Sequence, residues 1–173
     1  ALLQGNGKDE GLTDEEFVWF FLMLIAAGNE STRTVTTQGM RMLMENPDQL
    51  QYLVENPDKI PGACEEMLRY NTAFTLMRRQ CMEDTEVGGY LIKKGDKVIM
   101  HYHTVNHDEK IFGADSMKFD IHRAERMPNL YNEHRAFGVG QHFCLGTHLA
   151  RLEMRIMFEE IIPRLRNPKL VGD

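Results

Sequence analysis

The longest patterned segment of the chain is a helix that begins near residue 14. Thr13 followed by Glu16 forms a capping box, and the acidic residues at 14–16 place negative charge where the helix dipole favours it. No proline follows until Pro47. The pattern therefore predicts a helix from about Asp14 to about Glu45, which at ~1.5 Å per residue is about 48 Å long.

The first half of this helix is apolar on every side. Residues 17–25 read FVWFFLMLI and leave no polar stripe that would face water. A helix that is hydrophobic all round is typical of the interior of a protein. We therefore expect this half of the helix to be a buried central element.

Two shorter helices follow, and prolines mark where each begins. Asn46-Pro47 opens a helix that continues through about Glu55, and Pro61 opens another that runs to about Tyr70. Proline suits the first turn of a helix because the N–H that it lacks has no partner there.

After residue 74 the residue pattern is no longer continuously helical. From residue 75 to 104, short β-type runs alternate with glycine-containing turns, which predicts small antiparallel strands. Residues 123–143 are irregular, and residues 145–166 read as a final amphipathic helix that Pro163 disturbs near its end. The sequence predicts a mainly α fold with a small β region.

Composition narrows the possible classes of protein. The chain has 173 residues and a formal charge of −6, with no basic run, so we expect no nucleic-acid partner. The apolar stretch 17–27 is shorter than the ~20 residues of a membrane span and has no secretory flank. The three cysteines are widely spaced and form no C-x-x-C pair, which favours a reducing, cytoplasmic location.

The most specific string is the glycine-rich loop at residues 137–146, FGVGQHFCLG, which delivers Cys144 to the start of a helix. A helix N-terminus stabilises a thiolate over a thiol, so Cys144 is placed to ionise. Gly138 and Gly140 let the backbone pass close to a flat ligand, and Gly146 lets the helix approach it. An inert buried thiol and a cysteine nucleophile paired with His142 are the alternatives.

This string resembles the haem-binding motif of the cytochrome P450 family, F-G-x-G-x-H-x-C-x-G, at every fixed position. The resemblance implies haem b (iron protoporphyrin IX) as the cofactor and Cys144 as the axial iron ligand, with Phe137, Gly138 and Gly146 beside the haem. It places His142 near a haem propionate, while a plain surface histidine is the alternative for that residue.

A second string, Glu66-Met67-Leu68-Arg69, resembles the E-x-x-R motif of the same family. Residues three apart share one face of a helix, so the Glu66 and Arg69 charges can pair. In the family the pair is buried and completed by a further arginine, and Arg123 stands in the matching place. The implied role is structural.

A third string, AGNEST at residues 27–32, resembles the oxygen-binding run A-G-x-[DE]-T-[TS]. Glycine and hydroxyl side chains weaken a helix interior, so we expect a bulge there. The resemblance places Ala27 and Gly28 against the haem and gives Glu30 and Ser31 the delivery of protons to dioxygen. Serine stands where threonine is usual, so Thr32 is a candidate to share the task.

Further residues follow from their places in the family pattern. Arg79, on a predicted strand, matches an arginine that binds a haem propionate, as a guanidinium fork suits a carboxylate. The positions that match substrate-pocket residues are Met23, Ala26 and Ala27 on the long helix and the segment 72–76, which includes Thr75 and Leu76.

The resemblance covers residues 1–173 but only the C-terminal portion of a family member: long central helix, E-x-x-R helix, small strands, cysteine loop and final helix. It implies a haem-thiolate monooxygenase that hydroxylates or epoxidises an apolar terpenoid, steroid or fatty acyl substrate with dioxygen. The implied electron donor is a ferredoxin with its NAD(P)H-dependent reductase, and we expect it to dock at Arg135, Arg151 and Arg155. The alternative is a truncated, non-catalytic fragment with a structural or interaction role.

Overall fold

A computed structural model describes residues 11–165 and 168–171. Its helices of eight or more residues are α1 (Asp14–Glu45), α2 (Pro47–Glu55), α3 (Ile60–Tyr70) and α8 (Thr147–Ile161). Its short helices are η1 (Pro57–Lys59), α4 (Tyr102–Val105), α5 (Glu109–Phe112), α6 (Arg123–Arg126), α7 (Leu130–Glu133), η2 (Gly140–His142) and η3 (Ile162–Arg164). The prediction of a mainly α fold with a small β region is confirmed.

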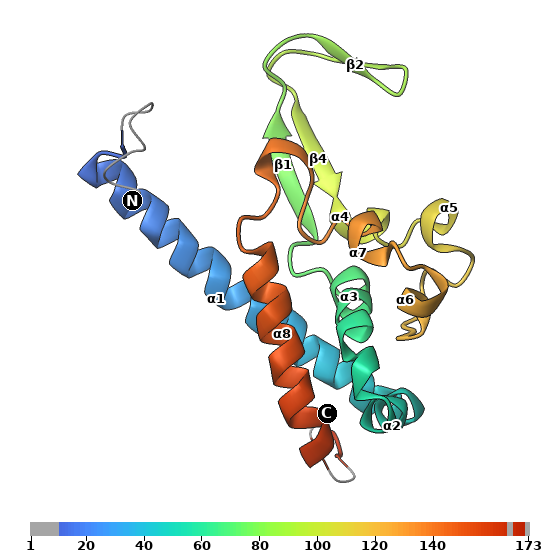
Figure 1. Cartoon of the computed structure of the whole chain (residues 1–173). Coiled ribbons are helices and arrows are strands. Elements are labelled where there is room, and N and C mark those ends of the chain that lie inside the picture. The colour runs from blue at the N-terminus through green and yellow to red at the C-terminus, as the bar shows by residue number, and fades with distance from the viewer. Residues whose placement is uncertain (1–10, 166–167, 172–173) are drawn as a thin grey trace.

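Four strands form two separate antiparallel ladders. They are β1 (Leu76–Gln80), β2 (Thr85–Val87), β3 (Tyr90–Ile92) and β4 (Lys97–His101). β1 pairs with β4, and β2 pairs with β3 across the turn Gly88-Gly89. Figure 1 shows the β2 hairpin at the end of the molecule farthest from α2.

The capping box at the start of α1 forms as predicted. The backbone N–H of Glu16 donates to Thr13 Oγ1 at 3.2 Å, and the backbone N–H of Thr13 donates to Glu16 Oε2 at 2.9 Å. The helix then runs without interruption to Glu45. The final helix is shorter than expected, because it begins at Thr147 and passes into η3 around Pro163.

The core lies where the C-terminal half of α1 packs against α3 and α8. Gly39 lets these helices approach, since a Cβ there would lie 2.6 Å from Met67 Sδ and 3.2 Å from Phe158 Cζ. The buried apolar residues of this core are Val35, Met42, Leu43, Leu50, Leu53, Ile60, Ala63, Cys64, Met67, Leu68, Ile121, Met154, Phe158 and Ile162.

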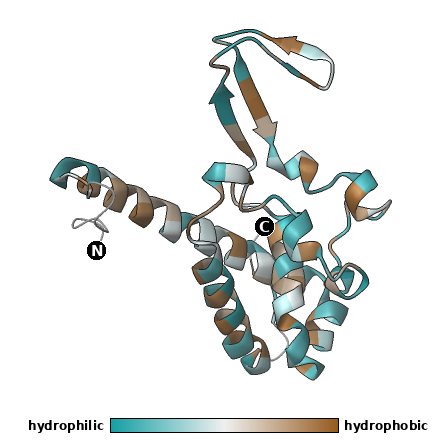
Figure 2. Ribbon diagram, turned by 45° about the horizontal axis from the view of Figure 1, so that its top comes forward, coloured by the Kyte–Doolittle hydropathy of each residue, from teal (hydrophilic) through white to brown (hydrophobic). Residues whose placement is uncertain are grey.

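The expectation that residues 17–25 are buried is wrong for the described chain. Trp19 is 66% exposed, and Phe21, Met23 and Ile25 are each more than half exposed. Figure 2 shows this hydrophobic half of α1 projecting away from the other helices. The described elements pack only against its C-terminal half, so the apolar pattern marks a surface that the described residues do not cover. None of the described helices is both long and apolar enough to span a membrane.

Candidate functional site

The cysteine loop is a compact turn between residue 137 and the start of α8. Gly138 and Gly140 adopt φ values of 74° and 70°, which residues with a Cβ rarely adopt. The Cys144 N–H donates to the Phe137 carbonyl at 3.0 Å, and this bond closes the loop. Gly146 is the N-cap of α8. The predicted placement of Cys144 just before a helix is confirmed.

The surroundings of Cys144 fit a flat, mainly apolar cofactor. Its thiol is exposed, and within the described residues it makes no hydrogen bond. Val139, Phe143 and Leu145 also expose apolar side chains on this loop, with Leu145 73% exposed. A Cβ on Gly140 would meet nothing within 4 Å. The loop therefore offers one sulfur ligand bordered by exposed apolar side chains. A single cysteine sulfur is the protein ligand that haem-thiolate proteins provide to the iron.

The two polar residues assigned beside the haem lie at the surface. His142 ends η2 and is exposed, and no hydrogen bond joins it to Cys144 among the described residues, so the geometry does not support the pair as nucleophile and base. Arg79 lies on β1 opposite Val98 and is exposed. Its Nη1 donates to the Arg78 carbonyl at 3.1 Å, which leaves most of the guanidinium fork available.

The predicted oxygen-binding run lies beside an open groove of about 260 Å³ between α1 and the segment that leads into β1. The groove is lined by Ala26, Ala27, Glu30, Ser31, Thr34, Ala73 and Phe74. It brings together four of the individually predicted residues, Ala26, Ala27, Glu30 and Ser31, with Ala73 and Phe74 of the predicted segment 72–76. Met23, Thr75 and Leu76 are exposed outside it.

Two details of this run differ from expectation. The helix stays α-helical through residues 27–32, so the expected bulge does not form, although Ser31 Oγ does donate to the Ala27 carbonyl at 2.7 Å. Glu30 is not buried: its side chain is 69% exposed and pairs with Arg33 at 2.6 Å. Thr32 is half-buried, and its carbonyl accepts a hydrogen bond from Thr36 at 2.8 Å. The exposure of Glu30 follows from the described chain, which leaves this side of α1 in solvent.

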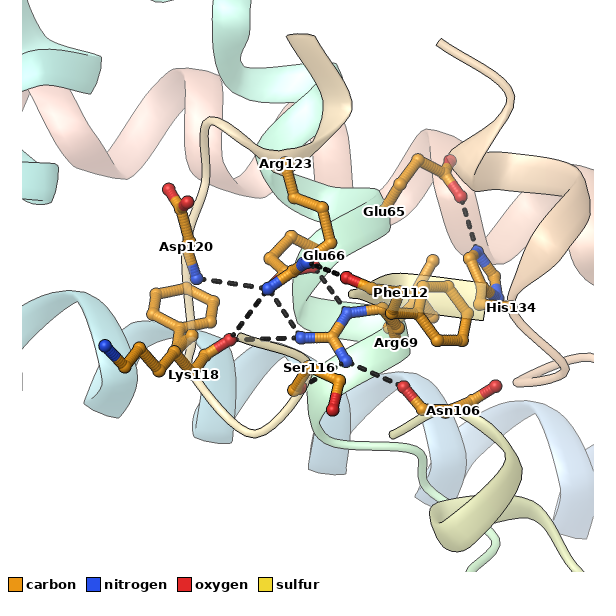
Figure 3. Close-up of polar contacts among 12 residues, drawn as sticks. Glu65, Glu66, Arg69, Asn106, Phe112, Ser116, Lys118, Asp120, Arg123 and His134 are labelled. Carbon is orange, nitrogen blue, oxygen red and sulfur yellow. Dashed lines mark hydrogen bonds and ion pairs between the residues drawn. The ribbon is translucent and has the colours of Figure 1, made fainter. Parts of the chain in front are cut away.

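The E-x-x-R pair forms a buried ionic triad with Arg123 (Figure 3). Arg69 donates to both Glu66 carboxylate oxygens, at 2.7 and 2.8 Å, and Arg123 Nε lies 3.2 Å from the same carboxylate. All three side chains are at most 3% exposed. The other guanidinium nitrogens donate to the backbone carbonyls of Asn106, Phe112, Asp115, Ser116 and Lys118. The triad therefore attaches the segment 106–123 to α3.

His107 lies beside this triad and makes stability depend on pH. Its Nδ1–H donates to the His103 carbonyl at 2.8 Å. Burial, assisted by the positive charges of Arg69, His103 and Arg123, lowers the pKa of His107 below its usual 6.5. As the pH falls through 6.5, His107 takes up a proton more readily in the unfolded chain than in the folded chain. The free energy of unfolding therefore decreases as the pH falls.

We expect this effect to disappear in His107→Phe, which keeps an aromatic ring against Tyr70. Urea unfolding from pH 7.5 to pH 5 measures it. The free energy of unfolding should fall more steeply with pH in the wild type than in the variant. Equal slopes would contradict the assignment to His107, because the other histidines titrate in both proteins.

A second polar cluster, which the sequence motifs did not predict, joins α3 to α8 and to the segment before the cysteine loop. Glu65 accepts hydrogen bonds from Arg151 at 2.8 and 3.0 Å and from His134 at 2.9 Å. Asn106, fully buried, accepts from the Arg135 backbone N–H at 2.6 Å. No local motif signals these contacts, since the partners lie far apart in the sequence. The one local feature that could have drawn attention to Glu65 is its position next to Glu66 on the same helix.

This cluster corrects the expected docking surface. Arg151 is not a free surface charge, because it forms a two-point ion pair with Glu65 and lies 4.7 Å above the Phe137 ring. Arg155 pairs with Glu159 at 3.3 Å. The side chain of Arg135 donates to the Asn132 carbonyl. Arg135, Arg151 and Arg155 all carry positive charge, but the guanidinium of Arg151 is engaged in an ion pair with Glu65 inside the fold.

Comparison with known proteins places these features in a family. The cytochrome P450 family model matches residues 1–167. The chain is 38% identical over its 173 residues to the steroid C26-monooxygenase of Mycolicibacterium smegmatis, and it spans 41% of that protein's length.

Solved structures agree. CYP109E1 from Bacillus megaterium, in complex with testosterone, superposes with a TM-score of 0.85 at 37% identity over 94% of this chain and 43% of its own. P450BioI, in complex with hexadec-9Z-enoic acid ligated acyl carrier protein, gives a TM-score of 0.85 at 37% identity over 94% of this chain and 40% of its own. The described chain thus has the fold of one part of these proteins. The chain belongs to the cytochrome P450 family, whose cofactor is haem b.

Proposed function

We propose that the protein is a haem-thiolate monooxygenase that hydroxylates or epoxidises an apolar substrate. The observation that carries the proposal is the exposed thiol of Cys144, held by a glycine-shaped loop at the start of α8 in a chain of the cytochrome P450 family. When bound, haem b supplies the activation of dioxygen and the insertion of one oxygen atom into the substrate.

The residues of this chain contribute binding, positioning and proton transfer. Cys144 provides the iron ligand. Because Gly138 and Gly140 have no side chains, they let the haem approach the Cys144 sulfur closely. Arg79 and His142 are exposed and provide positive or donor groups for the haem propionates. Ser31, whose hydroxyl is fixed by its bond to Ala27, and Glu30, which lines the same groove, move protons to dioxygen. Thr32 lies next to the groove and remains a predicted participant.

The substrate class follows from the lining and from the relatives. Ala26, Ala27 and Ala73 are small and Phe74 is aromatic, which suits a bulky apolar molecule. The relatives include a steroid C26-monooxygenase and an enzyme solved with testosterone. We propose a steroid or another terpenoid or fatty acyl molecule as substrate, a ferredoxin with its NAD(P)H-dependent reductase as electron donor, and a cytoplasmic location.

Two measurements on the haem-loaded protein, produced from its complete gene, test this function. The reduced protein with carbon monoxide should show the red-shifted Soret band of thiolate ligation. With isotope-labelled dioxygen, a reductant system and testosterone or palmitic acid as probes, product should carry one labelled oxygen atom. A bound haem without the thiolate band, or no labelled product from either probe, would contradict the proposal.

Coupling of electrons to product should depend on Glu30 and Ser31. In Glu30→Gln and Ser31→Ala, we expect product per electron consumed to fall about tenfold or more, because a positioned proton donor contributes ~10²-fold or more to such a step. Hydrogen peroxide should rise, and substrate affinity should stay near that of the wild type. Thr37→Ala removes an exposed hydroxyl of the same helix outside the groove and is the matched control. Unchanged coupling in both variants would remove these residues from the mechanism.

A further inference from the structure

The cluster of Glu65, His134 and Arg151 is a second polar anchor on α3, separate from the E-x-x-R triad. Consecutive helix residues point about 100° apart, so Glu65 faces the cysteine loop and α8 while Glu66 faces the segment 106–123. Figure 3 shows Glu65 bonded to His134 on one side of α3 and the triad on another. The Glu65 side chain is 16% exposed and that of His134 is 1% exposed.

The hydrogen bonds define the charge state that the cluster needs. The Ala136 backbone N–H donates to His134 Nδ1 at 3.3 Å, so Nε2 carries the proton that His134 donates to Glu65. Burial by itself raises the pKa of Glu65, but the bonds from His134 and Arg151 outweigh it and hold the pKa below its ordinary value. Glu65 is therefore an ionised carboxylate that accepts three charge-assisted or polar bonds.

Arg151 carries this anchor into the cysteine loop. Its guanidinium lies 4.7 Å from the centre of the Phe137 ring, and the Phe137 carbonyl accepts the Cys144 N–H that closes the loop. Nη1 of Arg151 donates to Thr147 Oγ1 at 2.9 Å, in the first turn of α8. One side chain thus contacts the first residue of the loop and the residue that follows it.

We propose that Glu65 is a positioning residue for the cysteine ligand: through Arg151 and His134 it fixes both ends of the loop and so keeps the Cys144 sulfur in its ligating position. The inference rests on the proposed function, since it concerns the thiolate that binds haem. Without the Glu65 charge, Arg151 loses its two-point partner and both loop ends lose the group that aligns them.

The test uses Glu65→Gln in the haem-loaded protein from the complete gene, because glutamine keeps the shape and removes the charge. We expect haem binding to persist. The thiolate band of the reduced carbon monoxide complex should be lost about tenfold faster than in the wild type, a factor that corresponds to ~1.4 kcal/mol. Hydrogen exchange should quicken in residues 137–146 and stay unchanged in the core of α1 and α3.

Glu159→Gln is the matched control, since Glu159 is an exposed carboxylate that pairs only with Arg155 on α8 among the described residues. It should leave band lifetime and loop exchange at the wild-type values. Arg151→Lys keeps the positive charge but loses the planar fork, so it should shift both readouts in the same direction as Glu65→Gln.

The outcomes separate this inference from the proposed function. If Glu65→Gln behaves as Glu159→Gln does, the positioning role is wrong, and if Glu65→Gln does not fold, a wild-type band lifetime in Arg151→Lys overturns it equally. A wild-type protein that binds haem without the thiolate band would instead contradict the proposed function, and the inference with it.

Discussion

The substitution Glu66→Gln is expected to lower the free energy of unfolding by about 3–5 kcal/mol, which is a large part of the ~5–15 kcal/mol that stabilises a typical domain. The reason is the burial of the triad: Arg69 and Arg123 are almost fully buried, and Glu66 is the carboxylate that both contact. With an amide in its place, Arg69 stays in the interior without a counter-charge, and Arg123 keeps only the partly exposed carboxylate of Asp115, at 3.2 Å. Denaturant unfolding of the haem-loaded protein measures the loss.

Glu45→Gln supplies the comparison, because Glu45 also pairs with an arginine on its own helix, Arg41, at 2.8 Å, but in solvent. That exposed pair should contribute only about 0–1 kcal/mol. A similar loss of stability in both variants would mean that burial of the triad does not decide its contribution. We also expect Glu66→Gln to loosen the segment 106–123 first, since Arg69 and Arg123 hold that segment through its carbonyl groups.

Local signals in the sequence predicted the helices and the loop well. The capping box at Thr13 and the prolines at 47 and 61 mark real helix starts, because capping and proline chemistry act within one turn. Gly138 and Gly140 adopt the positive φ values for which glycine is suited. The prediction that residues 17–25 are buried was wrong. An apolar pattern indicates a surface that favours burial. Which chain segment buries it depends on the tertiary structure and not on the local sequence.

The site follows the same division. Glu66 and Arg69 were predictable as a pair because they are three residues apart, whereas Glu65 meets a histidine 69 positions away and an arginine 86 positions away. Arg151 looked like a surface charge on an amphipathic helix, and only the packing of α8 against α3 brings it to Glu65. Contacts of this kind depend on how helices pack, and no local residue pattern encodes them.

Cys144→Ser is expected to abolish the thiolate Soret band and monooxygenation together. The wild-type band requires electron donation from a cysteine thiolate to iron, and a serine hydroxyl does not replace that ligand. The structure gives Cys144 an exposed sulfur on a closed loop, in contrast to the other two cysteines. The spectrum of the reduced carbon monoxide complex and product formation, both on the protein from its complete gene, measure the effect.

The other cysteines serve as controls because neither is exposed on the glycine-rich loop as Cys144 is. Cys64 is 2% exposed in the core, and burial raises the pKa of its thiol to about 12, so it is not ionised near neutral pH. Cys81 is partly buried, and its Sγ donates to the Glu83 carbonyl at 2.8 Å. Cys64→Ala, which avoids placing a hydroxyl in the core, and Cys81→Ser should both keep the band. A thiolate spectrum that survives Cys144→Ser would transfer the ligand role elsewhere and overturn the functional assignment of the loop.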